Sequence, residues 1–359
     1  MSEETGEDRT PETDGAGDGI LDSWTPPAPQ RGRLRKVLFG LAAAVVLLAA
    51  ITAGVGWWVY RKLDANIHTD KVTQKALSQR EAERPKPTGV AQNILIMGSD
   101  YRPELGSARS DTTMLLHLPA DGRSAQVISV PRDLMVWIPD CGEPGNYGLD
   151  PEAAPVAHEE GRPHYEQFNW SFERGGAACT IRTVEQLTGV RIDHHIVLGF
   201  DGFSRLIDAL GGVSVHLPHA ERDPNVGLDL PAGDLLLRGG DALAYVRARE
   251  YVGDGSDTNR MARQQEFMRL VAAKARGTDV LFNPVRLYRV LDAATSAVTA
   301  DAGLDSLDEL YRLVERLRAI PTDQVRYFTV PRKSYPQDPN RDILEQPAAD
   351  QLFADLRAR

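Results

Sequence analysis

An uncharged apolar run near the N-terminus constrains this chain more than any other feature. Residues 37–60 form 24 consecutive positions without a charged side chain. As a helix this run would be about 36 Å long, which is enough to cross a lipid bilayer with some tilt. A cleaved signal peptide is the alternative, but its apolar core is shorter and ends at a small-residue cleavage site. We therefore predict a single transmembrane helix over residues 37–60.

The residues that flank this run predict its orientation. Trp57, Trp58 and Tyr60 stand at its C-terminal end, where aromatic side chains favour the membrane–water interface. Four basic residues precede the run within residues 31–36, and two follow it, Arg61 and Lys62. Because basic flanks remain in the cytoplasm, we expect a cytoplasmic N-terminus and an extracellular C-terminal part.

The net charge of -10 is concentrated in the N-terminal tail. Residues 1–30 hold eight acidic residues and one basic residue, which gives -7 and leaves -3 for the rest. A nearly neutral remainder argues against nucleic acid as a partner. The expected organisation is a disordered acidic cytoplasmic tail over 1–36, the membrane helix over 37–60, a polar helical stalk over 61–88 and one globular domain over 89–359.

Short apolar strands alternate with helical patterns through that domain. Residues 93–98, 113–118 and 126–130 are apolar or β-branched runs and are predicted to be strands. Residues 140–168 resemble a long loop, and Asp201 is predicted to cap a helix that ends at Gly211. A further helix is expected over 177–188, helical stretches are expected near 240–249, 258–276 and 306–318, and further strands are expected over 195–200, 213–217 and 327–330. This alternation is typical of a three-layer α-β-α domain with a central mixed sheet.

The two cysteines, Cys141 and Cys179, both fall in the part expected outside the cell. An even number of cysteines in an oxidising compartment favours a disulfide, and two unrelated buried thiols are the alternative. The chain lacks the phosphate-loop, HExxH, CxxC and GxSxG motifs. His194 and His195 are neighbours at the start of a strand, so their side chains face opposite sides and predict a structural pair, not a metal site.

Charged residues gather at the ends of the predicted strands, where α/β domains place ligand sites. Asp100 follows the first strand, Arg109 and Asp111 lie at the start of the second, and Arg132 follows the third. Two aspartates with an arginine between them suit a Mg²⁺ ion and a phosphate oxygen. The alternative is a pair of aspartates that cap loops.

A later helix starts polar and becomes apolar along one face. Arg260 and Gln264 are four residues apart and share that face, which Phe267 and Val271 continue. Such a face suits a ligand with a charged head and an apolar tail. For each arginine alone, a solvated surface charge is the simpler reading, but arginines at four separate strand and helix ends favour convergence on a phosphate.

Arg247 and Arg249 are two residues apart, and their backbone decides whether they can act together. In a helix they would point about 200° apart, whereas in an extended segment they share a face. We predict that the helix from Gly240 ends before Arg247 and that residues 246–250 are extended. The alternative is a helix that exposes one of the two arginines to solvent.

Taken together, these motifs resemble the LytR-CpsA-Psr family of bacterial envelope proteins. The resemblance covers residues 93–270 in family order, and it rests on NILIMGSD (93–100), RSDTTMLLHL (109–118), VISVPRD (127–133), IRTVEQLTG (181–189), RIDHHIVLGFDGF (191–203), DALGGVSV (208–215), GGDALAYVRAR (239–249) and DTNRMARQQEF (257–267). The cysteine pair is not general to that family.

The resemblance implies an extracellular phosphotransferase that moves an anionic glycopolymer, such as a teichoic acid, from a polyprenyl diphosphate carrier onto peptidoglycan. It implies that Asp100 and Asp111 hold Mg²⁺ and that Arg109 acts beside them in catalysis. It further implies a diphosphate site formed by Arg109, Arg132, Arg247, Arg249, Arg260 and Gln264. It also implies a polyprenyl pocket, which agrees with the apolar helix faces of Phe203, Leu206, Ile207, Leu210, Phe267 and Val271.

Three other functions use the same features differently. A polyprenyl diphosphate hydrolase would need the same residues with water as acceptor, so only its products would distinguish it. A non-catalytic polyprenyl-lipid-binding protein would not need both aspartates and every arginine. A membrane-bound transcription attenuator would need a cytoplasmic surface for nucleic acid, and the predicted cytoplasmic tail is short and acidic.

Overall fold

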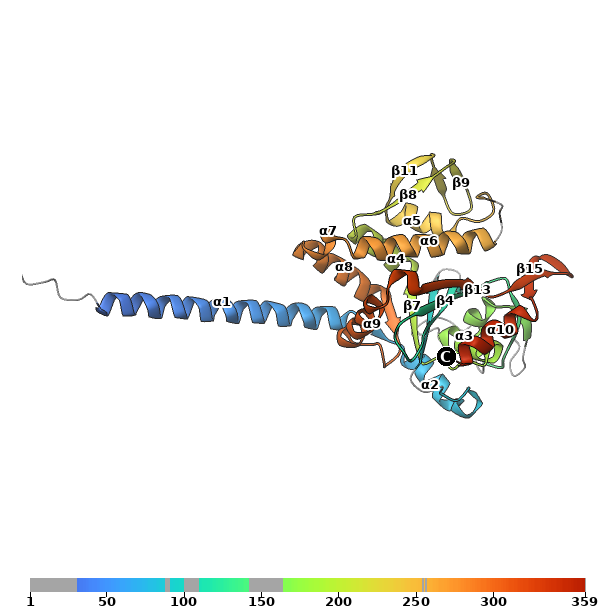
Figure 1. Cartoon of the computed structure of the whole chain (residues 1–359), viewed down its shortest axis with the longest axis horizontal. Coiled ribbons are helices and arrows are strands. Elements are labelled where there is room, and N and C mark those ends of the chain that lie inside the picture. Colours follow the sequence, from blue (N-terminus) through green and yellow to red (C-terminus); the bar gives the residue numbers. More distant parts are fainter. Residues whose placement is uncertain are drawn as a thin grey trace, which may run out of the picture. The chain divides into compact units, whose positions relative to one another are not determined.

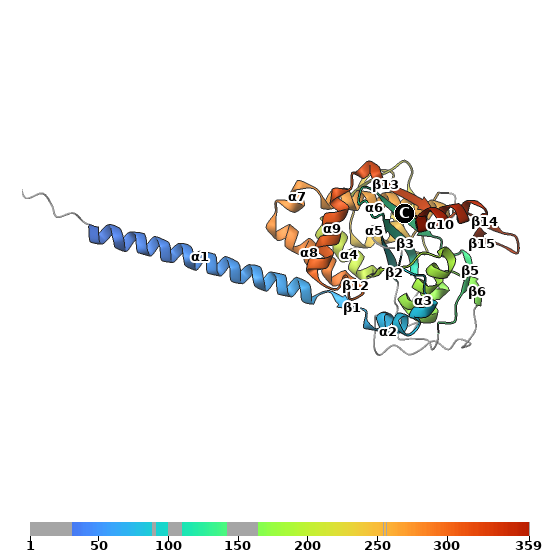
Figure 2. The same ribbon diagram turned by 60° about the horizontal axis from the view of Figure 1, so that its bottom comes forward.

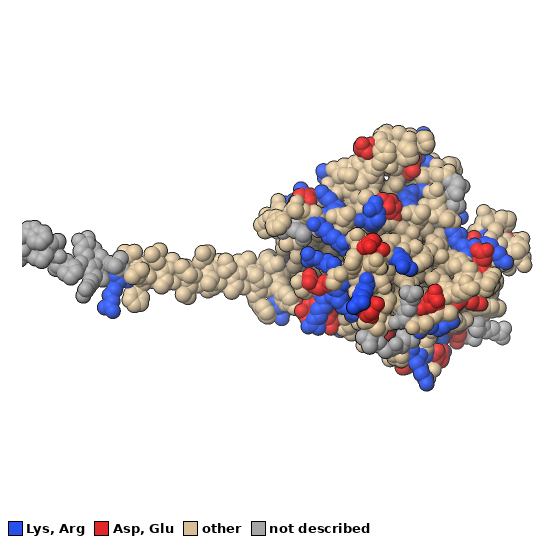
Figure 3. Space-filling view, viewed as in Figure 1, with Lys and Arg blue, Asp and Glu red and all other residues tan. Residues whose placement is uncertain are grey.

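The computed structural model describes residues 31–87, 91–99, 110–141, 164–253, 255 and 257–358. The chain divides into two compact units, Met1–Gly56 and Trp57–Arg359. Helix α1 (Arg31–Ala65) contains the uncharged run. Over residues 35–65 it is the one helix, in the part of the chain that is described, long and apolar enough to cross a membrane. Figure 3 shows its apolar stretch as a surface without charged side chains.

A seven-stranded sheet forms the centre of the second unit (Figure 1). Its strands lie in the order β1 (His68–Thr69), β12 (Val298–Ala300), β7 (His194–Gly199), β2 (Gln92–Ser99), β3 (Ser110–Leu118), β4 (Ala125–Val130) and β13 (Val325–Thr329). Strand β3 is antiparallel to β2 and β4, whereas β2 is parallel to β7 and β4 is parallel to β13. The predicted central mixed sheet is therefore confirmed.

The two faces of the sheet bury alternate side chains of the same strands. On β2, Leu95 and Met97 join one apolar cluster and Ile94 joins another, because successive strand residues point to opposite faces. The first cluster includes side chains of α2 (Lys71–Gln79), α3 (Trp170–Thr188) and α10 (Ala348–Ala358), and the second includes those of α9 (Leu307–Ala319). Figure 2 shows α2, α3 and α9 around the sheet. The predicted three-layer α-β-α architecture is confirmed.

A further group of helices builds a third apolar cluster of its own. It contains residues of α4 (Phe200–Ala209), α5 (Gly239–Arg247), α6 (Asp257–Ala275), α7 (Thr278–Leu281) and α8 (Pro284–Ala297). Two small antiparallel pairs pack on these helices: β8 (Val213–Leu217) with β11 (Gly233–Leu237), and β9 (Glu221–Asp223) with β10 (Leu228–Leu230). This cluster extends the domain beyond the three layers.

Some boundaries differ from those predicted. Helix α4 begins at Phe200 with Gly199 as its cap, so Asp201 lies in the first turn and does not cap the helix as predicted. In the first turn, the negative charge of Asp201 is stabilised by the positive end of the helix dipole, without a capping hydrogen bond. The pattern did not predict α7, α8 and α10, nor the pairs β5 (Met135–Ile138) with β6 (His164–Gln167) and β14 (Arg332–Tyr335) with β15 (Asp338–Leu344). Short 3-10 turns lie at Glu81–Glu83 and Thr322–Gln324.

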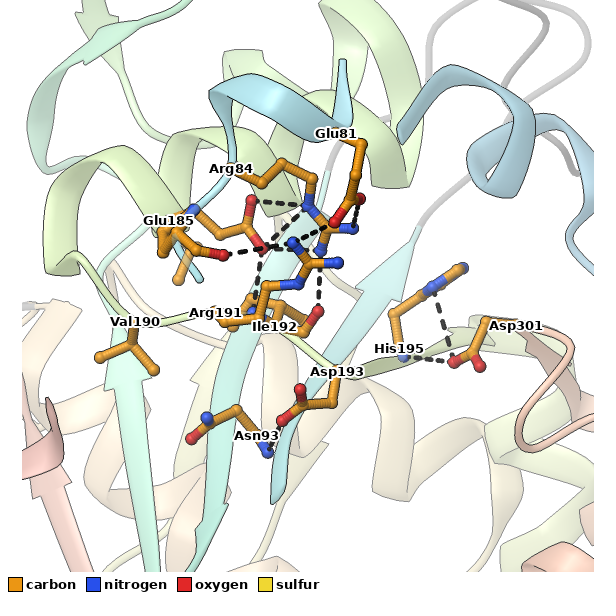
Figure 4. Close-up of polar contacts among 12 residues, drawn as sticks. Glu81, Arg84, Asn93, Glu185, Val190, Arg191, Ile192, Asp193, His195 and Asp301 are labelled. Carbon is orange, nitrogen blue, oxygen red and sulfur yellow. Dashed lines mark hydrogen bonds and ion pairs between the residues drawn. The ribbon is translucent and has the colours of Figure 1, made fainter. Parts of the chain in front are cut away.

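The segment expected to act as a stalk contributes to the second unit over its described residues. Strand β1 pairs with β12 at the edge of the sheet, and α2 buries Leu77. Arg84 then donates from Nε and Nη2 to the carboxylate of Glu185, at 3.0 Å and 2.7 Å, where their side chains are 8% and 2% exposed (Figure 4). Burial acts to lower the pKa of Arg84, but the hydrogen bonds and charge of Glu185 outweigh it and raise that pKa.

His194 and His195 pair with carboxylates, as a structural pair predicts, and Asp301 lies near both rings, with its Oδ2 atom 3.8 Å from Nδ1 of His195. The Nδ1 atom of His194 lies 3.0 Å from Asp301 Oδ1, and Nε2 of His195 lies 3.1 Å from Asp70 Oδ2. The hydrogen bond to Asp301 raises the pKa of His194. For Asp301 itself, burial acts to raise the pKa, but hydrogen bonds from His194 and the backbone of His195 lower it overall.

The predicted disulfide between Cys141 and Cys179 is present, with their Cα atoms 5.4 Å apart. It packs on a kink in α3 at Gly175 and Gly176. A Cβ atom at Gly175 would approach Cβ of Cys179 to 2.9 Å and Cβ of Cys141 to 3.2 Å, so a larger side chain there would displace the bridge. The kink therefore provides the space in which the helix and the loop are joined.

Candidate functional site

The predicted polar residues that the structure describes lie together where β2 and β4 end and β3 begins, and we call this side of the sheet the charged edge. Because β2 and β4 both run antiparallel to β3, the ends of β2 and β4 lie beside the start of β3. Asp111 at the start of β3 accepts a hydrogen bond of 2.9 Å from Nη1 of Arg132, which follows β4. Asp100 and Arg109 lie outside the described residues, and Asp100 directly follows Ser99 at the end of β2.

Asp133 links two of the predicted arginines, and sequence reasoning did not assign it to the site. Its side chain is only 7% exposed, and its Oδ2 atom lies 2.9 Å from Nη1 of Arg249 and 3.5 Å from Nε of Arg132. Arg341 lies 4.0 Å from the other oxygen. The backbone N–H of Arg249 also donates to Asp223, at 2.8 Å. The sequence feature that could have identified Asp133 is its position in the Pro131-Arg132-Asp133 motif, directly after a buried strand.

Helix α5 ends at Arg247, so the prediction that it ends before this residue is wrong. The helix keeps its last turn because Ala248 N–H donates to the carbonyl of Ala244, at 2.8 Å. The chain leaves the helix at Ala248, with φ -57° and ψ 137°, and it turns again over residues 249–252, where the N–H of Val252 donates to the carbonyl of Arg249 at 3.2 Å. The prediction that residues 246–250 form one extended segment is therefore also wrong. The guanidinium carbon of Arg247 lies 4.7 Å from the ring centroid of Phe200, a cation–π contact, while Arg249 reaches Asp133. The two arginines therefore come from different backbone conformations.

Helix α6 holds the end of α5 through side-chain amide and guanidinium groups. Gln264 donates from Nε2 to the carbonyl of Val246 at 3.0 Å, and Arg263 donates to the carbonyls of Tyr245 and Ala248. These carbonyls have no helical partner at a helix C-terminus, so the donors satisfy them. Arg263 was not predicted, and burial lowers its pKa. Gln264 was predicted to contact the diphosphate, and in the structure its side chain contacts the backbone carbonyl of Val246.

Arg260 connects α6 to the edge of the sheet. It is 3% exposed, and its Nη2 atom lies 3.5 Å from the carbonyl oxygen of Asp111. The structure thus joins Asp111, Arg132, Arg249 and Arg260 through direct contacts or through Asp133. Four predicted arginines, including Arg247, and two carboxylates give this described part of the edge a positive balance, which suits an anionic ligand.

The six residues predicted for the lipid pocket also come together. All of them belong to the apolar cluster of α4–α8, and they are Phe203, Leu206, Ile207, Leu210, Phe267 and Val271. The ring centroids of Phe203 and Phe267 are 6.1 Å apart. Helix α6 carries Arg260 at its polar start and Phe267 two turns later, so the charged edge and the apolar cluster share one helix.

Hard oxygen donors are present where the metal ion is implied. Asp111 offers a carboxylate that is 17% exposed, and Ser99 has a buried Oγ atom that finds no hydrogen-bond partner among the residues that the structure describes. Oxygen donors of this kind fit Mg²⁺. No group of three metal-binding side chains is found among the residues that are described, a set that excludes Asp100.

Comparisons with known proteins agree with the fold. The cell wall biosynthesis protein LcpA of Corynebacterium glutamicum is 30% identical over 320 residues, which cover 82% of this chain and 60% of LcpA. A second relative, the polyisoprenyl-teichoic acid–peptidoglycan teichoic acid transferase TagU of Halalkalibacterium halodurans, is 32% identical over 219 residues, or 61% of this chain and 63% of TagU. This chain therefore spans less than two thirds of the length of either relative.

A solved structure and a family profile extend this agreement. The LytR-Csp2A-Psr enzyme from Actinomyces oris has the same fold, with a TM-score of 0.56 and 23% identity over 76% of this chain and 93% of that one. The profile of the LytR_cpsA_psr family matches residues 59–358, which include every described residue of the charged edge and the apolar cluster. The chain therefore belongs to the LytR-CpsA-Psr family.

Proposed function

We propose that the protein is a membrane-anchored phosphotransferase that moves a glycopolymer from a polyprenyl diphosphate carrier onto peptidoglycan. The observation that carries this proposal is the junction of a positively charged edge with an apolar cluster on helix α6. A polyprenyl diphosphate has the same two parts, a compact anionic head and a long apolar tail. The relatives named as cell wall biosynthesis proteins and teichoic acid transferases support the same class of substrate.

In this proposal the arginines bind the diphosphate and offset its charge. Asp133 orients Arg132 and Arg249 by direct contact, so that their donors are fixed before the ligand arrives. An acceptor hydroxyl attacks the phosphorus nearest the polymer, and the bond from that phosphorus to the bridging oxygen breaks. The lipid monophosphate leaves, and Asp100 or Asp111 takes the hydroxyl proton.

A magnesium ion is part of the proposal. Asp100 and Asp111 would hold it, and when bound it would supply positive charge to the diphosphate oxygens. Asp111 can contribute to such a site because its carboxylate is partly exposed and pairs with Arg132 through one oxygen.

The assay uses full-length protein with a polyprenyl diphosphate-linked glycopolymer, with and without peptidoglycan fragments. We expect polymer on peptidoglycan and lipid monophosphate, and both products should be lost in Asp111→Asn. The control is Asp229→Asn, whose side chain is 78% exposed and pairs only loosely, at 4.0 Å, with the equally exposed Arg222. Free polymer released equally with and without acceptor would instead identify a hydrolase, and lipid bound without any product would identify a binding protein.

The shape of the arginine side chains gives a second test. Arg247→Lys and Arg249→Lys each keep the charge but lose the forked donor geometry, so each should lower the transfer rate sharply. Arg312→Lys, at a side chain that is 70% exposed, is the matched control. Near-normal rates in both lysine variants would leave only a requirement for charge.

The proposed orientation places the second unit outside the cell. Protease added to cells with a permeable wall should then digest residues beyond 60 and spare the tail before residue 37. A protected domain would reverse the orientation and remove access to peptidoglycan.

A further inference from the structure

The turn between α7 and α8 exposes large apolar side chains on a firmly packed base. Phe282 is 83% exposed and Val285 is 60% exposed. Just before them, Val280 is fully buried in the apolar cluster of α4–α8. We call residues 277–285 the elbow. Because its base is packed, the elbow presents its apolar side chains in a fixed place, and such exposed apolar groups mark contact surfaces.

Helix α8 runs beside the last turns of α1 in the same direction. Lys62 Nζ donates to Tyr288 Oη at 2.7 Å, and Asn66 Nδ2 donates to Asp292 Oδ1 at 3.0 Å and Thr295 Oγ1 at 3.3 Å. The contacts therefore advance by four residues, or about one turn, along both helices, so α1 and α8 run parallel here. Figures 1 and 2 both show α8 beside this end of α1.

The same register can be followed backward, toward the apolar run. Tyr288 is four residues into α8, so the start of α8 lies about 6 Å back along its axis. The same step back from Lys62 on α1 reaches Trp58. The Lys62 ammonium lies 6.0 Å from the Trp58 ring centroid and 5.4 Å from that of Tyr288, so it bridges the two rings. The elbow therefore lies level with the aromatic end of the apolar run, where a spanning helix meets the interface.

The charges around the elbow fit a lipid surface. Residues 274–292 contain four basic and two acidic side chains, a balance of +2. Lys274 and Arg286 both pair with Asp279, at 2.7 Å and 2.8 Å, and so remain beside the exposed apolar groups. Apolar side chains flanked by basic ones are the pattern of segments that lie in the interface of membranes with anionic lipids.

We propose that the elbow is a second membrane contact, in which Phe282 and Val285 enter the interface of the bilayer that α1 spans. The basic side chains face anionic headgroups. This contact brings one end of the α4–α8 apolar cluster to the membrane surface, because Val280 of the elbow belongs to that cluster. A lipid tail could then pass from the bilayer to the cluster without crossing water. The membrane contact itself does not depend on the reaction proposed above.

The test uses the full-length protein in nanodiscs of phosphatidylcholine and phosphatidylglycerol. The native cysteines form a disulfide, so a fluorophore attaches only to an added cysteine, in Phe282→Cys or Val285→Cys. Lipids with a nitroxide on the acyl chain should quench both labels. The matched control is Leu236→Cys on β11, a side chain that is 51% exposed and should stay unquenched. Both elbow residues are exposed, so neither substitution removes core packing.

Two results would overturn the inference. Quenching at positions 282 and 285 no greater than at position 236 would mean that the elbow stays in water. Shielding that appears only in discs with two protein copies would mean that a second copy covers the elbow. Neither result depends on transferase activity, so each is distinguishable from failure of the proposed function.

Discussion

Replacing Arg84 by Met should unfold this domain at a markedly lower temperature. Arg84 contacts both oxygens of the Glu185 carboxylate, and the two side chains are 8% and 2% exposed. Arg84→Met keeps much of the side-chain volume but leaves the buried carboxylate without its cation. Removing one partner of a buried ion pair costs about 3–5 kcal/mol. The residual hydrogen bond from the backbone N–H of Ile192 to Glu185, at 2.9 Å, does not neutralise the charge.

Thermal unfolding of the full-length protein, followed by circular dichroism, measures this cost. The unit Trp57–Arg359 has about 300 residues, and its unfolding entropy of about 2.1 cal/mol/K per residue means that 1 kcal/mol shifts the midpoint by roughly 1.6 °C. The expected drop is therefore about 5–8 °C. The control is Arg80→Met, because Arg80 is 35% exposed and pairs with the exposed Glu83, an interaction worth at most about 1 kcal/mol.

A double variant separates the effect of the unpaired charge from the effect of changed side-chain packing. Arg84→Met with Glu185→Met removes both charges, so it should recover much of the loss seen with Arg84→Met alone. If Arg84→Met lowers the midpoint no more than Arg80→Met does, the buried pair is not what fixes the segment before the sheet, and our reasoning fails.

Three further predictions concern other contacts. Asp133→Asn should lower the transfer rate by roughly ten- to hundredfold through lost charge-assisted hydrogen bonds, and steady-state kinetics showing a change below twofold would contradict its positioning role. The raised pKa of His194 means that its protonated ring stabilises the fold below pH 6.5 and that this contribution is lost as the pH rises through the folded-state pKa. His194→Gln removes this partner of Asp301, so the free energy of unfolding in urea should depend less on pH over that range. Cys179→Ser should lower the free energy of unfolding by about 4 kcal/mol, since the bridge to Cys141 closes a loop of 38 positions, and unchanged urea unfolding would show that the bridge adds nothing.

The sequence pattern predicted the elements whose signal is local. Residues 93–98 and 113–118 are apolar runs that supply both faces of the sheet, so their strand character is visible without knowing their neighbours. The end of α5 was misplaced because donors on α6 satisfy its last carbonyls, and these donors are far away in the sequence. A local pattern carries no information about such partners.

The same limit explains the unequal prediction of the site. Arginines and aspartates at strand ends are visible as motifs, and the structure does bring Asp111 and Arg132 together. Asp133 was not assigned because its importance comes from Arg249, which lies 116 positions later in the chain. The elbow was not predicted at all, since exposed Phe282 looks like an ordinary apolar residue until its surroundings are known.

The order of strands in the sheet has a consequence for how the chain can fold. Strand β13 pairs with β4 although Val325 and Ala125 are two hundred positions apart, and β1 pairs with β12 across a still longer interval. Of the seven strands in this sheet, β13 is synthesised last, so until then β4 is an edge strand with unpaired backbone groups. Pairings between distant segments also form slowly. A chain that ends before residue 325 would therefore leave the backbone groups of β4 free to pair with other chains, so such truncated chains should aggregate more readily than the full-length protein.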